Sequence, residues 1–201
     1  AVRGQVQKKK KLQEIITFIA RRKNDSGIIY CLSRKNTEEV ASHLKAEGHS
    51  VAFYHAGMRH EERESTQTDF INDDTKIIVA TIAFGMGIDK SNVRFVIHYN
   101  LPKNLEGYYQ EIGRAGRDGL PAETMLYYNM KDFVLYSQFA DSGANAAMQK
   151  EKLHRMLQFA EAKSCRRKIL LSYFGEHLTK NCGNCDVCEN PPKNFEGTIL
   201  T

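Results

Sequence analysis

The sequence has no long apolar run. None of its stretches approaches the roughly 20 consecutive apolar residues that a membrane-spanning helix needs, so we expect no membrane span. The basic segment 1–11 has no apolar stretch beside it and does not follow the pattern of a secretory signal. Internal repeats and low-complexity tracts are also missing, which argues against a repeat architecture.

The sequence also lacks the phosphate-binding loop G-x-x-x-x-G-K-[ST] that many nucleotide hydrolases use. The glycine-containing segment 81–89 is no substitute, because it has no Lys-Ser/Thr pair to hold phosphate and Mg²⁺. If this chain takes part in nucleotide chemistry, another domain or protein must therefore supply the phosphate-binding loop.

The composition is that of an ordinary globular protein, with 41% hydrophobic and 26% charged residues. At 201 residues the chain is long enough for one good core, or for one core and a small satellite. Its net charge of +5 and its pI near 8.9 permit a polyanionic partner without requiring one.

Short apolar segments alternate with amphipathic ones up to about residue 131. Most of the apolar segments are apolar on both faces, which predicts an α/β fold with a parallel sheet covered by helices on each side. After residue 131 the alternation ends, and we expect two domains, 1–131 and a smaller, mostly helical 132–201. The expected strands are 27–32, 51–54, 76–80, 93–99 and 123–128, and the expected helices are 8–23, 36–48, 60–71, 105–114 and much of 150–174.

The segment 108–119 carries Gln110, Arg114 and Arg117 at spacings of four and three residues. If the segment is helical, the three side chains share one face and offer a rigid array of donors suited to phosphate oxygens. Two glycines within it cost a helix about 1 kcal/mol each, which makes sense where a backbone or a nucleotide approaches closely. We expect both guanidiniums to be exposed at the rim of an open cleft; the alternative is a solvated basic helix end.

Four cysteines follow the spacing C-x16-C-x2-C-x2-C: Cys165, Cys182, Cys185 and Cys188. Four thiolates can surround one zinc ion at about 2.3 Å and leave no open position, which predicts a structural site that contributes to folding. Unliganded thiols and disulfides are alternatives, although disulfides need an oxidising compartment. An iron–sulfur cluster is the main rival, but its ferredoxin-type pattern requires a further cysteine after Cys188 that the sequence does not have.

Functional loops of a parallel sheet gather at the carboxyl ends of its strands. Ser33 and Arg34 follow the first expected strand and could contact a phosphate, although helix capping by Ser33 and a surface Arg34 explain the pair equally well. Thr81 begins the glycine-containing loop, in which Gly87 permits a tight turn and Asp89 adds a single carboxylate. Taken alone, this loop is a weak signal.

Three stretches, 28–44, 77–102 and 108–119, resemble motifs IV, V and VI of superfamily 2 helicases. Together with Cys165-Arg166-Arg167, the segment 173–175 and the cysteine-rich segment 182–188, they make the chain look closely like the bacterial RecQ DNA helicases from about residue 11 to 197. The resemblance implies the second of two RecA-like lobes, followed by a zinc-binding subdomain. It also implies a parent enzyme that binds ATP·Mg²⁺ between its lobes, translocates 3′ to 5′ along DNA and acts in recombination and repair.

The resemblance also implies roles for individual residues. Arg117 would be the arginine finger, with Arg114 beside it in the nucleotide-contacting row. Gln110 would help to sense the phosphates, and Asp89, next to Gly87, would lie near the ribose or couple nucleotide state to DNA grip. The expected contacts with the DNA backbone are Ser33, Arg34 and Thr81.

The chain departs from the family in lacking the whole first lobe, with its G-x-x-x-x-G-K-[ST] and D-E-x-H motifs, and the winged-helix and HRDC modules. We therefore expect a fragment that alone neither hydrolyses ATP nor unwinds DNA. Its expected partners are single-stranded and duplex-junction DNA and the missing first lobe. The resemblance places the parent enzyme in the bacterial cytoplasm, associated with the nucleoid.

Two other functions are compatible with the sequence. One is a non-catalytic module that binds nucleic acid or protein and uses a truncated motor lobe as its scaffold. Binding directed at phosphates would weaken steeply with salt, whereas protein binding need not. The other is the lobe of an RNA helicase, against which the cysteine cluster argues only through the family comparison.

Overall fold

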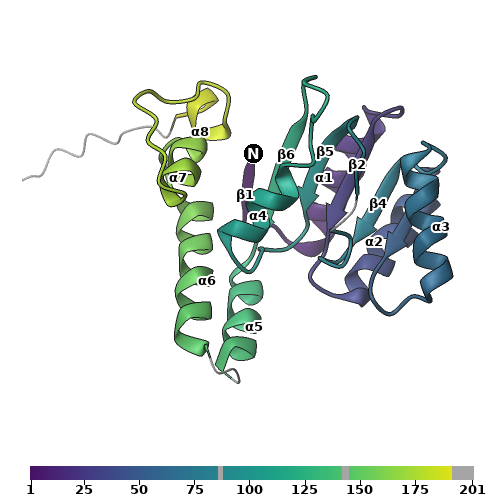
Figure 1. Ribbon diagram of the computed structural model, residues 1–201, viewed down its shortest axis with the longest axis horizontal. Coiled ribbons are helices and arrows are strands. Elements are labelled where there is room, and N and C mark those ends of the chain that lie inside the picture. The colour runs from purple at the N-terminus through teal and green to yellow at the C-terminus, as the bar shows by residue number, and fades with distance from the viewer. Residues whose placement is uncertain (86–87, 142–144, 192–201) are drawn as a thin grey trace, which may run out of the picture. The chain divides into compact units, whose positions relative to one another are not determined.

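The computed structural model describes residues 1–85, 88–141 and 145–191. Its strands form one parallel sheet in the order β1-β6-β5-β2-β4-β3, with helices on both faces, which confirms the expected α/β fold (Figure 1). The strands are β1 Val2–Gly4, β2 Ser26–Tyr30, β3 Val51–Tyr54, β4 Ile77–Ala80, β5 Val93–His98 and β6 Glu123–Tyr128.

The helices agree with most of the predicted ones, and the bounds of β3, α3 and β6 were predicted to the residue. Strand β1 and helices α5 and α8 were not predicted; α8 lies in a segment that was expected to be a loop. The helices are α1 Lys8–Ala20, α2 Arg34–Ala46, α3 His60–Ile71, α4 Leu105–Ile112, α5 Met130–Asp141, α6 Ala146–Glu161, α7 Arg166–Tyr173 and α8 Asp186–Glu189.

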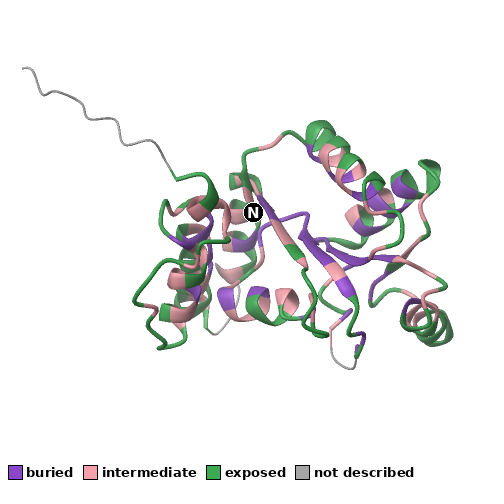
Figure 2. Ribbon diagram, turned by 90° about the horizontal axis from the view of Figure 1, so that it is seen from above, coloured by how far each residue is buried: buried purple, intermediate pink, exposed green. Residues whose placement is uncertain are grey.

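The core has two layers, one on each face of the sheet (Figure 2). Because successive side chains of a strand point to opposite faces, Ile29 packs with α1 and α2, while Ile28 packs with Phe70 of α3. Each fully buried side chain of this size contributes about 1.5–3 kcal/mol. Cys31 is buried, as predicted for a small hydrophobic residue, and burial raises the pKa of its thiol to about 12.

The chain forms two compact units, Ala1–Ala160 and a second that begins at Glu161. Helix α6 packs on α4 within the first unit, since Lys152 pairs with Glu106 at 2.7 Å and the Phe159 ring lies 5.3 Å from that of Tyr108. The predicted domain boundary after residue 131 stays a prediction. None of the described helices has the length and apolar composition needed to cross a membrane.

Gly27 in β2 has no room for a side chain. A Cβ at this position would lie 2.0 Å from the ring of the fully buried Phe95. We therefore expect Gly27→Ala to lower the free energy of unfolding by about 3 kcal/mol, measured by urea denaturation. Ser65→Ala, at an exposed position of α3, should change it by less than about 0.5 kcal/mol. Equal stability of the two variants would contradict the packing described for this strand.

Candidate nucleotide, nucleic-acid and metal sites

The predicted common helical face of Gln110 and the two arginines does not exist. Helix α4 contains Gln110 and ends before Gly113, and both Arg114 and Arg117 lie in the turns that follow. Gly116 has a φ of +66°, a conformation that glycine adopts without steric cost and that ends any helical path. The prediction was wrong because it treated the two glycines as costs within a helix, whereas they end it.

Arg114 is buried, with 5% of its surface exposed, so the prediction of an exposed guanidinium is wrong for this residue. Its Nη2 donates a hydrogen bond to the carbonyl oxygen of Gly85, and within the described structure its Nε has no hydrogen-bond partner. Arg114 and Gln110 do line the same cavity, of about 490 Å³, at the carboxyl ends of β2 and β5. The structure thus brings these two predicted residues together at one hollow.

Arg117 is more accessible, with 39% of its side chain exposed. Its Nη1 donates to the carbonyl oxygen of Ile88 at 3.1 Å, and its Nε donates to that of Gly113 at 3.3 Å. Its Nη1 also lies 3.5 Å from the carboxylate of Asp89, whose side chain is 95% exposed. An ion pair this open to water contributes little, about 0–1 kcal/mol. Arg117 and Asp89, both predicted site residues, therefore lie together.

The turn that carries the arginines is attached to the chain segment leading into β5. The amide of Gly116 donates to Val93 O at 2.9 Å, and that of Asp118 donates to Ser91 O at 3.3 Å. The guanidinium of Arg94 pairs with the carboxylate of Asp118. These bonds place residues 113–119, which we call the arginine loop, beside the amino end of β5, a position that the sequence pattern did not indicate.

The other predicted polar residues lie near the carboxyl ends of the strands, and each has a structural contact. The Ser33 hydroxyl accepts a hydrogen bond from Asn36 N at 3.2 Å and caps α2, which was the alternative explanation. The exposed Arg34 lies over Gly57, where a Cβ would be 2.8 Å from its Nη1. Thr81 Oγ1 accepts from Ala83 N at 3.4 Å. Gly87 lies outside the described residues.

The four predicted cysteines form one cluster in the second unit. The Sγ atoms of Cys165, Cys182, Cys185 and Cys188 all lie within 4.8 Å of one another. A tetrahedron of sulfurs about 2.3 Å from zinc has sulfur–sulfur edges of about 3.8 Å. The distances of 3.4 Å and 3.9 Å from Cys188 to Cys185 and Cys182 bracket that value. Side chains of this kind in this arrangement suit a structural Zn²⁺ ion.

Backbone groups around the cluster favour the thiolate form that binds metal. Burial of Cys165 opposes ionisation, but hydrogen bonds from the backbone N–H groups of Cys182 and Lys168 and from the neighbouring thiols outweigh it and lower the pKa of Cys165 to about 6. The Cys185 side chain raises the pKa of Cys188 to about 11, so the thiols share protons within the cluster when no metal is bound. The amide of Arg166 donates to Cys185 Sγ at 3.4 Å. The Arg166 guanidinium also donates to Asp186 through Nε and Nη2, both at 3.2 Å, so α7 is fixed to the cysteine-rich segment.

This ion pair gives a test of the metal site. Because Arg166 fixes the helix that begins at Cys165, we expect Arg166→Leu to weaken zinc binding about 10- to 100-fold, measured by competition with a chromophoric chelator. Arg167→Leu removes an equal charge from the next, exposed position and should leave the affinity unchanged. If both variants bind zinc as tightly as the parent chain, the Arg166–Asp186 pair does not support the site.

Comparison with known proteins places the chain among helicases. The model of the helicase conserved C-terminal domain matches residues 7–119, and that of the RecQ zinc-binding domain matches residues 130–189. The ATP-dependent DNA helicase RecQ of Pasteurella multocida is 48% identical over 197 residues, covering 96% of this chain and 31% of that protein. The protein of the same name from Haemophilus influenzae is 46% identical, covering 96% and 32%. The chain thus spans about a third of the length of these curated relatives.

The fold also agrees with solved structures. The crystal structure of a DEAD box protein from the hyperthermophile Methanococcus jannaschii has a TM-score of 0.57 and 27% sequence identity to this chain, covering 65% of this chain and 36% of that one. The sheet is therefore RecA-like. These comparisons confirm the resemblance inferred from the three motifs and the cysteines.

Proposed function

We propose that this chain is the second motor lobe and zinc-binding subdomain of an ATP-dependent 3′–5′ DNA helicase. The chain belongs to the RecQ helicases, whose conserved C-terminal helicase domain and zinc-binding domain it contains. On this proposal residues 1–131 are the RecA-like lobe and 132–201 the subdomain, a division supported by family matches that end at 119 and resume at 130. The parent enzyme acts in recombination and repair, in the bacterial cytoplasm at the nucleoid.

The observation that carries the proposal is the setting of Arg117. Two neutral carbonyl oxygens, from Ile88 and Gly113, orient its guanidinium without cancelling the charge. Asp89 supplies the only carboxylate paired with it in the described structure, through a solvent-exposed contact that a triphosphate oxygen can replace at small cost. Arg117 is therefore suited to act as an arginine finger on ATP·Mg²⁺ held by a first lobe.

The cavity lined by Gln110 and Arg114 lies at the same edge of the sheet, the carboxyl ends of the strands, as the proposed DNA contacts. At the shared cavity, Gln110 helps to sense the phosphates and Arg114 contacts the nucleotide beside it. Gly87 and Asp89, which lie in the sequence between β4 and β5, are the other proposed nucleotide contacts. Single-stranded DNA and the duplex junction contact the carboxyl ends of the strands. On this proposal, closure on ATP moves the arginine loop and the DNA contacts together, because both belong to the same lobe. The proposed DNA contacts are Ser33, Arg34 and Thr81.

A chimera with a complete relative tests whether this chain can act as part of a motor although it cannot hydrolyse ATP alone. We expect the chain alone to release no phosphate from ATP, with or without single-stranded DNA, because it has no phosphate-binding loop. The same chain placed in the Pasteurella multocida relative, in exchange for the matching third, should restore DNA-stimulated hydrolysis. Lys45→Ala, at an exposed position of α2, serves as the control variant. DNA-stimulated hydrolysis by the chain alone, or a folded chimera without activity, would refute the proposal.

A second candidate is a non-catalytic nucleic-acid-binding module. The observation that favours it is Arg114, whose guanidinium is buried and already donates a hydrogen bond to Gly85 O. Fluorescence anisotropy with labelled single-stranded DNA, at 50 and 200 mM salt, tests it on the chain alone. Tight binding that falls steeply with salt, together with an inactive chimera, would favour the module over the motor.

A further inference from the structure

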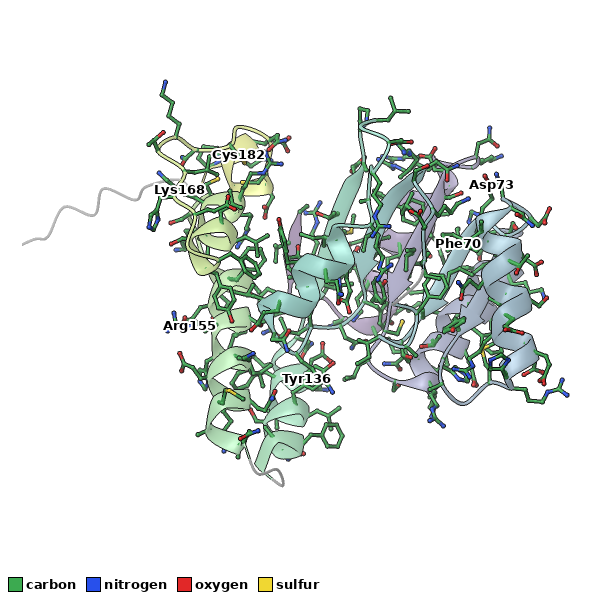
Figure 3. All side chains as sticks on the ribbon, in the orientation of Figure 1. Phe70, Asp73, Tyr136, Arg155, Lys168 and Cys182 are labelled. Atoms are coloured by element: carbon green, nitrogen blue, oxygen red, sulfur yellow. The ribbon has the colours of Figure 1, made fainter. Side chains whose placement is uncertain are left out.

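The carboxylate of Asp73 is the centre of a polar cluster at the amino ends of the strands. Asp73 lies in the turn between α3 and β4, with a φ of +68°, and is labelled beside Phe70 in Figure 3. It accepts hydrogen bonds from Ser26 Oγ at 2.8 Å, from Lys76 Nζ at 3.1 Å and from Asn92 Nδ2 at 3.3 Å. Burial works against ionisation, but these donors and Lys90 hold the pKa of Asp73 far below its usual range.

Lys90 is the buried member of this cluster. Its side chain is 2% exposed, and its Nζ lies 3.0 Å from Asp73 Oδ1. The same Nζ donates to Ile71 O at 3.3 Å and lies 5.2 Å from the centre of the Phe70 ring. A buried ammonium is tolerated only where it is paired, so the segment around Lys90 is anchored where Asp73 lies.

The anchored segment is the one that holds the arginine loop. Lys90 and Asn92 contact Asp73. The backbone carbonyl oxygens of the same segment accept hydrogen bonds from the arginine loop, at Ile88, Ser91 and Val93. Ile88 O receives the bond from Arg117 itself. The guanidinium of Arg117 therefore takes its position from a backbone that is fixed, a few residues away, by the Asp73–Lys90 pair.

We propose that Asp73 and Lys90 are positioning residues for Arg117, acting through the backbone of residues 88–93. The inference rests on the proposed role of Arg117 for its effect on the reaction, but the anchoring itself does not depend on that role. Loss of the pair lets residues 88–93 shift, and a displacement of about 1 Å at a catalytic group can cost about 100-fold in rate.

The anchoring is measured on the chain itself by amide hydrogen exchange. Lys90→Met keeps the length and the apolar stem of the side chain but removes the charge, and it should speed exchange at Gly116 and Asp118 at least tenfold. Asp73→Asn, which suits the positive φ, is the second variant if the first does not fold, and should act in the same direction. Asp74→Asn removes an exposed carboxylate one residue away and is the matched control. Exchange unchanged in a folded variant would overturn the proposal, whatever the ATPase shows.

A double-mutant cycle in the chimera tests the link to catalysis. Lys90→Met should lower kcat for ATP hydrolysis roughly 10- to 100-fold with little change in the KM for ATP. In an Arg117→Ala background the same substitution should have no further effect, because the group that it positions is gone. A purely structural role would lower the rate equally in both backgrounds and would overturn the proposal. Failure of Arg117→Ala to slow the chimera would instead refute the proposed function and leave the exchange result to decide the anchoring.

Discussion

Chelation of metal from the purified chain is expected to unfold residues 161–191 while residues 1–160 stay folded. Among the described residues of the second unit, only Cys165 and Leu170 are buried, which is too small an apolar core to hold a unit together. Structural zinc contributes about 10–16 kcal/mol of apparent binding free energy in small domains. Without the ion, the four thiols also lose the metal coordination that would hold their Sγ atoms within 4.8 Å of one another.

Hydrogen exchange resolved along the chain, before and after chelation, is the measurement. Cys182→Ser should reproduce the effect of the chelator and lower the zinc content from one ion per chain to near none. Cys31→Ala alters a buried cysteine of the first unit and should leave the zinc content at one. Protection of residues 161–191 that survives chelation would mean that the fold of this unit does not depend on metal. Iron found in place of zinc would favour the iron–sulfur cluster, the main rival named in the sequence analysis.

Replacement of Arg117 by alanine should lower the ATPase rate of the chimera about 10³-fold or more, the range expected when an arginine finger is lost. The effect belongs to kcat, because the guanidinium stabilises charge that develops in the transition state. Arg117→Lys should recover little of the rate, since an ammonium cannot reproduce two directed N–H bonds to Ile88 O and Gly113 O while facing a phosphate.

Steady-state kinetics with saturating single-stranded DNA, for the parent chimera, both Arg117 variants and Lys45→Ala, give the comparison. Arg114→Ala is informative in a different way. Its buried guanidinium bonds to Gly85 O, so this variant should lose stability as well as rate, whereas Arg117→Ala should melt like the parent. If Arg117→Ala retains more than about a tenth of the parent rate, the arginine-finger assignment is wrong.

The parts of this structure that follow from local chemistry were predictable. The bounds of β3, α3 and β6 could be read because each lies between clear turn residues, such as Asn72 and Asp73 after α3. The cysteine cluster could be read because three of its members lie within seven residues and the spacing itself limits the geometry. The helicase family followed from motifs that the comparisons then matched over most of the chain.

What the sequence did not reveal depends on contacts between distant residues. The burial of Arg114 depends on Gly85, and the orientation of Arg117 depends on Ile88, each 29 residues away along the chain. Helical periodicity assigned both arginines to one face because it could not show where Gly113 would end the helix. The cluster around Asp73 was missed for the same reason, since Ser26 lies 47 residues from it.

The place of β1 has a consequence for how the chain is made. Among the described strands, Val2–Gly4 pairs with β6 alone, and Val2 lies opposite Leu126 in that ladder. Among the strands of this sheet, β1 is made before β6 and cannot pair until β6 follows, whereas β2, β3 and β4 can already assemble. Until β6 arrives, the edge of β5 stays open, so synthesis that stalls before residue 123 leaves a nascent chain able to pair with its neighbours.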